Sequence, residues 1–143
     1  MTEKRIFSSE IPPPSRAGER VVLGMSGGAD SSVAARLLIE AGYEVLGVTF
    51  RMPGAAGPVG DGHDPPGQRA ARVCGRLGIA HDTVDVAGMF ERRVVAPFVE
   101  AYRGGATPNP CVTCNESVKF PSLAGYADAR GIRRIATGHY ARL

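Results

Sequence analysis

Long hydrophobic runs and cysteines are both scarce in this sequence. No stretch approaches the roughly 20 consecutive apolar residues that a membrane-spanning helix needs. The N-terminal stretch "MTEKRIFSSEIPPPSRAGER" carries charges but lacks the apolar segment of a secretory signal peptide. The three cysteines are too few, and odd in number, for a disulfide framework. We therefore expect a soluble cytoplasmic protein without membrane contact.

Internal repeats and a strong excess of either charge are also absent. The formal net charge of +3 suits a polyanionic partner but does not require one. With 143 residues, 43% of them hydrophobic, the chain can form one domain with a core. Residues 1–19 contain three consecutive prolines and no periodicity, so they predict a mobile tail before a domain at 20–143.

Short apolar runs alternate with helical patterns from Arg20 onward. The predicted strands span 20–25, 44–50, 80–86 and a last run that ends at Thr137. The predicted helices span 31–43, 68–79, 89–105 and a last segment that ends near Arg130. This alternation predicts the α/β class, with a parallel sheet that carries helices on both faces.

Three of these helices have a predicted buried face, and two segments are predicted to be loops. The buried faces comprise Val33, Leu37, Leu38 and Ala41; Ala70, Val73, Cys74 and Leu77; and Phe90, Val94, Phe98 and Tyr102. Pro97 predicts a kink or an earlier break in the third helix. Residues 51–67 are rich in proline and glycine, which predicts a loop. In 106–117, two prolines flank an asparagine, so we expect neither a helix nor a central strand.

Residues 24–32, "GMSGGADSS", lie between the first predicted strand and the first predicted helix. Open parallel sheets bind ligands at this position, where strand carboxyl ends meet helix N-termini that attract anions. The stretch offers glycines for close backbone approach, hydroxyl donors and one carboxylate for magnesium: Gly27, Gly28, Ser26, Ser31, Ser32 and Asp30. The alternative is a tight turn in which Asp30 or Ser31 caps the helix. The Gly-Lys-Ser/Thr ending of a P-loop and the dinucleotide-binding glycine spacing are both absent.

Several motifs resemble those of one enzyme family. "SGGADSS" resembles the SGGxDS loop of ATP pyrophosphatases, which cleave ATP to AMP and pyrophosphate while they adenylate a substrate oxygen. "TPNPCVTCN", "VKF" and "ATGHYARL" resemble motifs of the tRNA-specific 2-thiouridylases, and the resemblance covers residues 20–143. It implies a Rossmann-like fold of the adenine nucleotide alpha-hydrolase type, with strand order 3-2-1-4. It also implies adenylation of the C2 oxygen of the wobble uridine, followed by cysteine-mediated sulfur transfer that gives 2-thiouridine, AMP and pyrophosphate.

The resemblance further implies site residues, ligands and partners. The implied ATP-binding residues are Gly24, Met25, Ser26, Gly27, Gly28, Ala29, Asp30, Ser31, Phe50 and Gly138. Cys114 aligns with the nucleophilic cysteine, and the implied catalytic pair is Cys114 with Cys111. The positions implied to meet tRNA are Asn109, Pro110, Cys111 and His139. Asp30 is the implied magnesium contact, through the phosphates. The implied partners are tRNA, a cysteine desulfurase or relay protein, and a missing C-terminal half or partner chain.

The chain departs from the family pattern at three positions. Cys111 stands where many members have an aspartate, Glu116 where a basic residue is more usual, and Arg69 where an aspartate is. The cysteine that carries the persulfide in the family lies downstream of these residues, as do the tRNA-binding domains. These differences put the sulfur half of the reaction in question.

The pair formed by Cys111 and Cys114 leaves several interpretations open. A zinc site needs two more ligands, for which His81 and His139 are candidates. An iron–sulfur cluster needs a further cysteine, either Cys74 or one from a partner chain, and a redox disulfide is the third interpretation. Cys74 lies on a predicted inner helix face, which favours simple burial. Two other functions also remain open: adenylation of a small molecule or carrier protein, and a non-catalytic nucleotide-binding subunit.

Four further side chains have two interpretations each. Asp85 ends the third predicted strand, where it contacts a ribose or metal or else caps a turn. Arg133 and Arg134 form a phosphate clamp or a solvated edge. Tyr140 stacks on a base or packs against the sheet.

Overall fold

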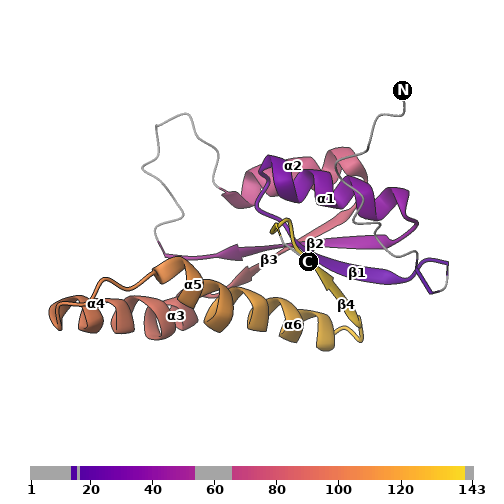
Figure 1. Ribbon diagram of the computed structural model, residues 1–143. Helices are drawn as coiled ribbons and strands as arrows, with labels where there is room; N and C mark the ends of the chain where they lie inside the picture. The colour runs from indigo at the N-terminus through magenta and orange to yellow at the C-terminus, as the bar shows by residue number, and fades with distance from the viewer. Residues whose placement is uncertain (1–13, 16, 54–65, 141–143) are drawn as a thin grey trace, which may run out of the picture.

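A parallel sheet of four strands organises the residues that the computed structural model describes, which are 14–15, 17–53 and 66–140 (Figure 1). The strands are β1 (Arg20–Gly24), β2 (Glu44–Arg51), β3 (Ala80–Asp85) and β4 (Arg134–Ala136). Their spatial order is β3-β2-β1-β4, and each neighbouring pair is parallel. The predicted α/β class and strand order are therefore confirmed.

Helices cover both faces of the sheet. α1 (Ala29–Glu40) and α2 (Pro66–Leu77) lie on one face, and α6 (Phe120–Asp128) lies on the other (Figure 1). Successive residues of a strand point to opposite faces, and accordingly Val21 and Leu23 pack toward α1 and α2 while Val22 packs toward α6. The predicted buried face of α2 is confirmed. Ala70 and Cys74 are fully buried there, with Val73 and Leu77 packed against the same cluster.

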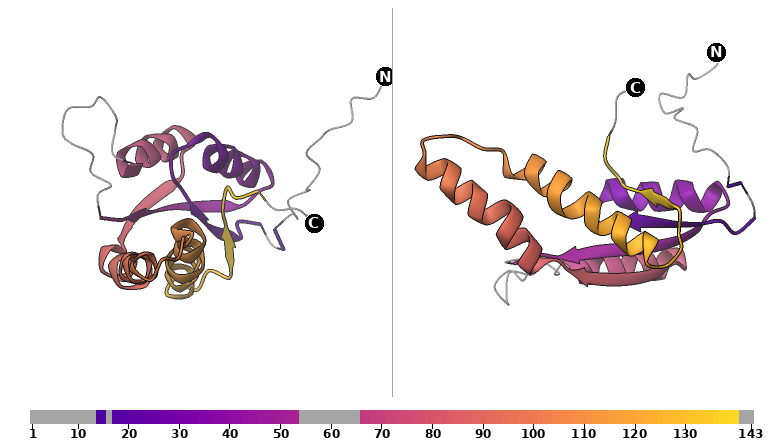
Figure 2. Two further views of the ribbon diagram at one scale, coloured as in Figure 1. Left: turned by 60° about the vertical axis from the view of Figure 1, so that its left-hand side comes forward. Right: turned by 90° about the horizontal axis from the view of Figure 1, so that it is seen from below.

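Two helical runs, which we call the first and the second arm run and together the arm, extend past the end of the sheet on its α6 side (Figure 2). The first comprises α3 (Ala87–Phe90), the π-helix η1 (Glu91–Val95) and α4 (Ala96–Arg103). The second comprises α5 (Pro110–Cys114), the π-helix η2 (Asn115–Lys119) and α6. A cluster made of Val86, Val94, Cys114 and Val118, which we call the arm cluster, packs the two runs together. Pro97 lies in the first turn of α4, directly after η1. The backbone stays helical from η1 into α4, so the predicted break before Pro97 is wrong, and the wider π turn of η1 precedes the proline instead.

The prediction that 106–117 contains no helix is wrong, because α5 begins at Pro110. Asn109 caps this helix: its Oδ1 accepts hydrogen bonds from the N–H groups of Cys111 (3.1 Å) and Val112 (3.4 Å). Proline is well suited to the first helical position, where its missing N–H costs nothing. The Asn-Pro sequence is thus a helix start, although proline generally interrupts helices.

Two predicted buried faces are also partly wrong. In α1, Val33 and Leu37 are exposed, and the buried residues are Ser31, Ala35 and Leu38. The small side chains at Ser31 and Ala35 let the helix lie close to the sheet, which the hydrophobic pattern alone did not indicate. In the first arm run, Val94 is buried but Tyr102 is 67% exposed. The wider turn of η1 changes the helical register of the residues that follow it.

Parts of three predictions lie outside the described residues. These are most of the tail at 1–19, positions 54–65 of the predicted loop, and the last three residues of the "ATGHYARL" motif. Within the tail, Glu19 accepts a hydrogen bond from Arg134 Nε at 2.8 Å, and Ser15 Oγ accepts one from Arg134 Nη2 at 3.1 Å. In the described ranges, none of the helices has the length and apolar character that crossing a membrane requires.

Candidate nucleotide site

A cavity of about 460 Å³, which we call the loop cavity, opens at the carboxyl ends of β1 and β2. Parallel strands end there beside the amino end of α1, which is where open α/β sheets bind ligands. Its lining residues are Gly24, Met25, Ser26, Asp30, Ser31, Val48, Thr49, Phe50, Met52, Lys119, Phe120, Leu123, Thr137, Gly138 and His139. The cavity therefore combines residues from the two ends of the domain with residues from the second arm run.

The loop before α1 forms a network of hydroxyl and backbone hydrogen bonds. Ser31 Oγ accepts from the Ser26 N–H (3.3 Å) and lies 3.1 Å from Ser26 Oγ. Ser26 Oγ in turn accepts from the Gly28 N–H (3.2 Å). Gly28 is the N-cap, and no side chain caps the helix. The interpretation of Asp30 or Ser31 as a cap is therefore wrong, and the first N–H groups of α1 have no side-chain acceptor, as an anion site requires.

Two glycines of the site make contacts that exclude any side chain. Gly27 has φ +75°, and a Cβ there would lie 2.7 Å from the backbone nitrogen of Ala70 in α2. A Cβ on Gly138 would lie 2.8 Å from the backbone nitrogen of Ser31. Real Cβ atoms do not approach other atoms this closely, so glycine is required at both positions. The segment after β4 thus lies directly against the amino end of α1.

Tyr140 extends this contact. Its hydroxyl donates a hydrogen bond to Asp30 Oδ1 at 2.9 Å, and the same interaction raises the pKa of the Tyr140 hydroxyl. Neither interpretation made from the sequence, stacking on a base or packing on the sheet, describes this contact. Asp30 is the one carboxylate among the lining residues of the loop cavity. Because Mg²⁺ is usually bound through one or two carboxylates together with phosphate oxygens, this donor set fits magnesium.

A chain of hydrogen bonds supports the loop from the sheet. Thr49 Oγ1 is 2.7 Å from the Met25 carbonyl oxygen and 2.8 Å from His81 Nε2. A carbonyl only accepts, so the single hydroxyl proton of Thr49 is donated to Met25. His81 Nε2 must then carry a proton and donate it to Thr49. Burial lowers the pKa of His81, and the neighbouring Asp82 opposes this shift.

The two cysteines of the arm lie in different environments. Cys111 is exposed, whereas Cys114 is only 6% exposed and belongs to the arm cluster. Burial raises the pKa of the Cys114 thiol, Lys119 acts in the opposite direction, and Cys111 adds a smaller upward effect. Neither cysteine lines the loop cavity.

Cys74 lies on the other face of the sheet, in the core with α1 and α2, so its predicted burial is confirmed. Burial raises the pKa of its thiol. Within 14–15, 17–53 and 66–140, no three His, Cys, Asp or Glu side chains come together as metal ligands. A zinc or iron–sulfur site at Cys111 and Cys114 therefore receives no third ligand from the described residues.

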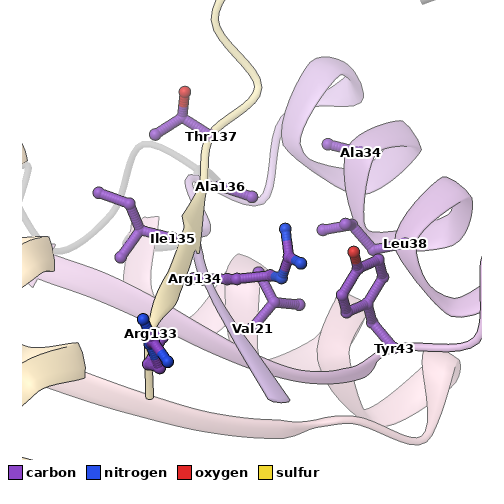
Figure 3. Close-up of a pocket in the computed structure, with 9 residues that line it drawn as sticks. All are labelled: Val21, Ala34, Leu38, Tyr43, Arg133, Arg134, Ile135, Ala136 and Thr137. Carbon is purple, nitrogen blue, oxygen red and sulfur yellow. The ribbon is translucent and has the colours of Figure 1, made fainter. Parts of the chain in front are cut away.

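A second cavity, of about 530 Å³, lies along β4 and α1 (Figure 3). Its lining includes Val21, Leu38, Tyr43 and Ile135, together with Arg134. The guanidinium of Arg134 pairs with Glu19 and lies 5.8 Å from the centre of the Tyr43 ring. Arg134 is thus part of a structural contact at the sheet edge, and it does not line the loop cavity.

Asp85 and Asp82 likewise have structural partners. Asp85 accepts from the Ala87 N–H at 2.8 Å and pairs with Arg51, which lowers the pKa of its carboxyl. The turn-capping interpretation of Asp85 is the one the contacts favour. Asp82 accepts from Tyr126 Oη at 2.7 Å and so joins β3 to α6.

Comparison with known proteins identifies the family. The model of the tRNA methyl transferase HUP domain family matches residues 19–143. The chain belongs to this family. Its relatives include tRNA-specific 2-thiouridylase MnmA 1 of Bacteroides fragilis, 49% identical over 87% of this chain and 33% of the relative. The tRNA-specific 2-thiouridylase MnmA of Sorangium cellulosum is also 49% identical, over 89% of this chain and 34% of the relative. The resemblance inferred from the motifs is confirmed, and the chain spans about a third of these relatives' length.

Solved structures support the HUP domain fold. A predicted subunit of a tRNA methyltransferase from Methanocaldococcus jannaschii has a TM-score of 0.58 at 22% identity, over 84% of this chain and 52% of that one. A glutamine-dependent NAD+ synthetase from Acinetobacter baumannii, in complex with ADP, has a TM-score of 0.58 at 16% identity, over 83% of this chain and 21% of that one. At this identity the likeness concerns the fold alone.

The structure brings most of the implied ATP-binding residues of this HUP domain into one cavity. Those that line it are Gly24, Met25, Ser26, Asp30, Ser31, Phe50 and Gly138, and His139 lines it as well. Gly27, Gly28 and Ala29 shape the loop without lining the cavity, and Asn109, Pro110 and Cys111 lie away from it. Sequence reasoning missed Thr49, Met52, Lys119, Phe120 and Thr137 as lining residues. Two signals could have found most of them: the polar Thr49 next to Phe50 in a buried strand, and the quoted motifs "VKF" and "ATGHYARL", which contain Lys119, Phe120 and Thr137.

Proposed function

We propose that the loop cavity binds ATP and that the chain adenylates the wobble uridine of tRNA as part of a 2-thiouridylase. One observation supports this most directly. Two motifs more than a hundred residues apart, the loop at 24–32 and the segment at 137–140, meet at the uncapped amino end of α1. An uncapped helix end with a nearby carboxylate suits a polyphosphate with its magnesium ion.

The lining of the cavity suggests how ATP would be oriented. The phosphates would lie at Ser26 and Ser31, with Asp30 holding the magnesium ion that offsets their charge. The apolar side, formed by Phe50, Met52 and Leu123, would receive the adenine ring. Backbone N–H groups at a helix terminus stabilise charge that develops on a phosphoryl group, so the loop can contribute to the transition state.

The chemistry requires two successive displacements. The uridine C2 oxygen attacks the α-phosphorus of ATP, and the bond to the β-phosphate breaks to release pyrophosphate. The terminal sulfur of a persulfide on Cys114 then attacks C2, and the C2–O bond breaks to release AMP. A second thiol, Cys111 or one outside this chain, cleaves the sulfur–sulfur bond and leaves a disulfide, while the transferred sulfur stays on the base.

The buried state of Cys114 sets a condition on this scheme. A buried thiol with a raised pKa is a poor nucleophile, because the thiolate is the reactive form. The arm cluster must therefore open before Cys114 accepts or delivers sulfur. Binding of tRNA against the second arm run is the step we expect to open it.

The proposal is tested by supplying ATP, magnesium, a persulfide-generating desulfurase and unmodified tRNA, with and without the C-terminal remainder of a full-length relative. Pyrophosphate release and 2-thiouridine are measured separately. We expect tRNA-dependent pyrophosphate release, and thiouridine when the remainder is present. Cys114→Ala should abolish thiouridine while pyrophosphate release persists, and Cys74→Ala is the matched cysteine control. Absence of both products under both conditions rejects the proposal, and pyrophosphate release that ignores tRNA assigns the site to another acceptor.

A further inference from the structure

One lysine of the loop cavity also acts on the cysteine of the arm. Lys119 lines the loop cavity, and it is the lining residue with a permanent positive charge. It is also one of only two lysines in the sequence. It belongs to the "VKF" motif, for which the family resemblance implied no role, and it lies outside both the loop at 24–32 and the cysteine pair.

The π-helix η2 brings Lys119 toward the side of the helix on which Cys114 lies. The two residues are five positions apart, and η2 spans Asn115–Lys119 between them. In an α-helix, residues five apart point about 140° away from each other. A π-helix closes hydrogen bonds from each residue to the fifth one along, so such residues lie roughly one above the other. The π turn thus places the lysine on the side of the helix that carries the cysteine.

The loop cavity and the arm cluster share a wall of side chains. Phe50 and Met52 line the loop cavity, and both also pack against the arm cluster that contains Cys114. The positive charge of Lys119 favours the thiolate form of Cys114 and so opposes the effect of burial. Lys119 itself is half-buried, so its charge is less screened than that of a fully exposed side chain.

We propose that Lys119 serves two anions at once, the phosphates of a nucleotide in the loop cavity and the sulfur anion of Cys114. Without this shared cation, the two anions repel each other across the wall formed by Phe50 and Met52. With it, each anion is stabilised by the lysine charge, so that the nucleotide and a charged sulfur can be present together. The inference rests on the proposed function and makes Lys119 a positioning residue that couples its two halves.

Coupling of this kind is reciprocal, which makes it measurable from either side. The first measurement is the affinity for a non-hydrolysable ATP analogue with magnesium. The second is the rate at which a small alkylating reagent labels Cys114, read by peptide mass spectrometry with Cys74 and Cys111 followed in the same digest. Neither measurement needs tRNA or a sulfur donor.

Lys119→Met removes the charge and keeps most of the side-chain stem. We expect it to weaken binding of the analogue about tenfold and to slow Cys114 labelling severalfold, within the range of typical coupling. The bound analogue should slow labelling by a larger factor in Lys119→Met than in the wild type. Lys119→Arg should restore both affinity and labelling, and Arg103→Met, which removes an exposed cation of α4, should change neither.

Each contrary outcome has one meaning. If Lys119→Met changes neither quantity, or changes only one, the shared-cation role is wrong. If Lys119→Arg fails as badly as Lys119→Met, the side chain acts through its shape and the inference is again wrong. If the wild-type chain does not bind the analogue at all, the proposed function itself fails. Circular dichroism and thermal unfolding of each variant separate these outcomes from loss of the fold.

Discussion

At the scale of single residues, the site depends most on a position that has no side chain. Gly138 lies so close to Ser31 that an added Cβ would be 2.8 Å from a backbone nitrogen and 2.9 Å from the Asp30 carbonyl carbon. Backbone atoms at the start of a helix cannot move aside without loss of its first turn. The segment after β4 and the loop at 24–32 must therefore separate if Gly138 is replaced by a residue with a side chain.

We predict that Gly138→Ala lowers the free energy of unfolding by about 1–3 kcal/mol, the usual cost of overpacking. It should also weaken binding of the ATP analogue more than tenfold. Gly125→Ala is the matched control, because a Cβ there, in α6, meets nothing within 4 Å. Glycine in a helix interior is destabilising, so the control should gain about 0.5–1 kcal/mol. Urea unfolding and analogue titration decide the matter, and equal behaviour of the two variants contradicts the close approach.

A second residue-scale prediction concerns pH. Burial holds the pKa of His81 below its ordinary value of 6.5, so the unfolded chain binds a proton more readily than the folded chain. The stability contributed by neutral His81 is therefore complete above about pH 6.5 and is lost as the pH falls from there through the folded pKa. Asp82 and Asp85 have lowered pKa values, so their contributions persist down to about pH 4.

We expect the wild type to lose unfolding free energy between about pH 7.5 and 5, and His81→Gln to lose less. Glutamine does not titrate, and its amide can still donate to Thr49. His139→Gln serves as the control, since it removes a different histidine and should keep the wild-type loss. Urea unfolding at the two pH values provides the measurement. An unchanged loss in His81→Gln would show that this histidine does not govern the acid sensitivity.

At the scale of elements, the start of α5 determines where the cysteine pair lies. Asn109→Ala removes the acceptor for the N–H groups of Cys111 and Val112, and we predict a loss of about 1 kcal/mol. Asn109→Asp keeps an acceptor and should be close to the wild type. Thermal unfolding measures both variants. Equal losses in both would mean that the amide has another structural role, whereas a defect of Asn109→Asp confined to tRNA binding would support the contact with the base.

The elements also show which features the sequence revealed. The strands were predictable because Val21, Val22 and Leu23 form an apolar run that parallel sheets bury on both faces. The face of α1 was not, because the contact of its amino end with Gly138 and the small side chains of Ser31 and Ala35 fix its orientation. The hydrophobic pattern of the sequence does not reveal such close backbone contacts.

The two π-helices account for a further part of what the sequence concealed. Each π-helix adds one residue to a helical turn. Side chains that the regular α-helical period would align on one face are therefore rotated away from that face. This applies to Tyr102 after η1 and to Lys119 within η2. The place of Ser26 and Ser31 in the loop cavity was predictable because both belong to one contiguous motif at 24–32. Lys119 and Phe120 reach the loop cavity from the second arm run and Met52 from the end of β2, and the "VKF" motif alone did not indicate this position.

At the scale of the whole molecule, the two halves of the proposed reaction occupy different bodies. The loop cavity belongs to the sheet, whereas Cys114 belongs to the arm, which extends past the sheet end (Figure 2). Phe50 and Met52, which line the loop cavity and pack against the arm cluster, connect them together with the second arm run. The chain spans about a third of its curated relatives, so the proposed thiolation is a property to be tested with the remaining two thirds present.

The closing contact of Gly138 with Ser31 has a consequence for synthesis of the chain. The loop at 24–32 leaves the ribosome early, but its partner segment is made more than a hundred residues later. β4, which carries that segment, pairs with β1 over only three positions. A nascent chain that already has β1, β2, β3 and both arm runs still lacks one wall of the loop cavity. A nucleotide bound as proposed therefore cannot assist the early stages of folding, and can stabilise the domain only once translation has passed the end of β4.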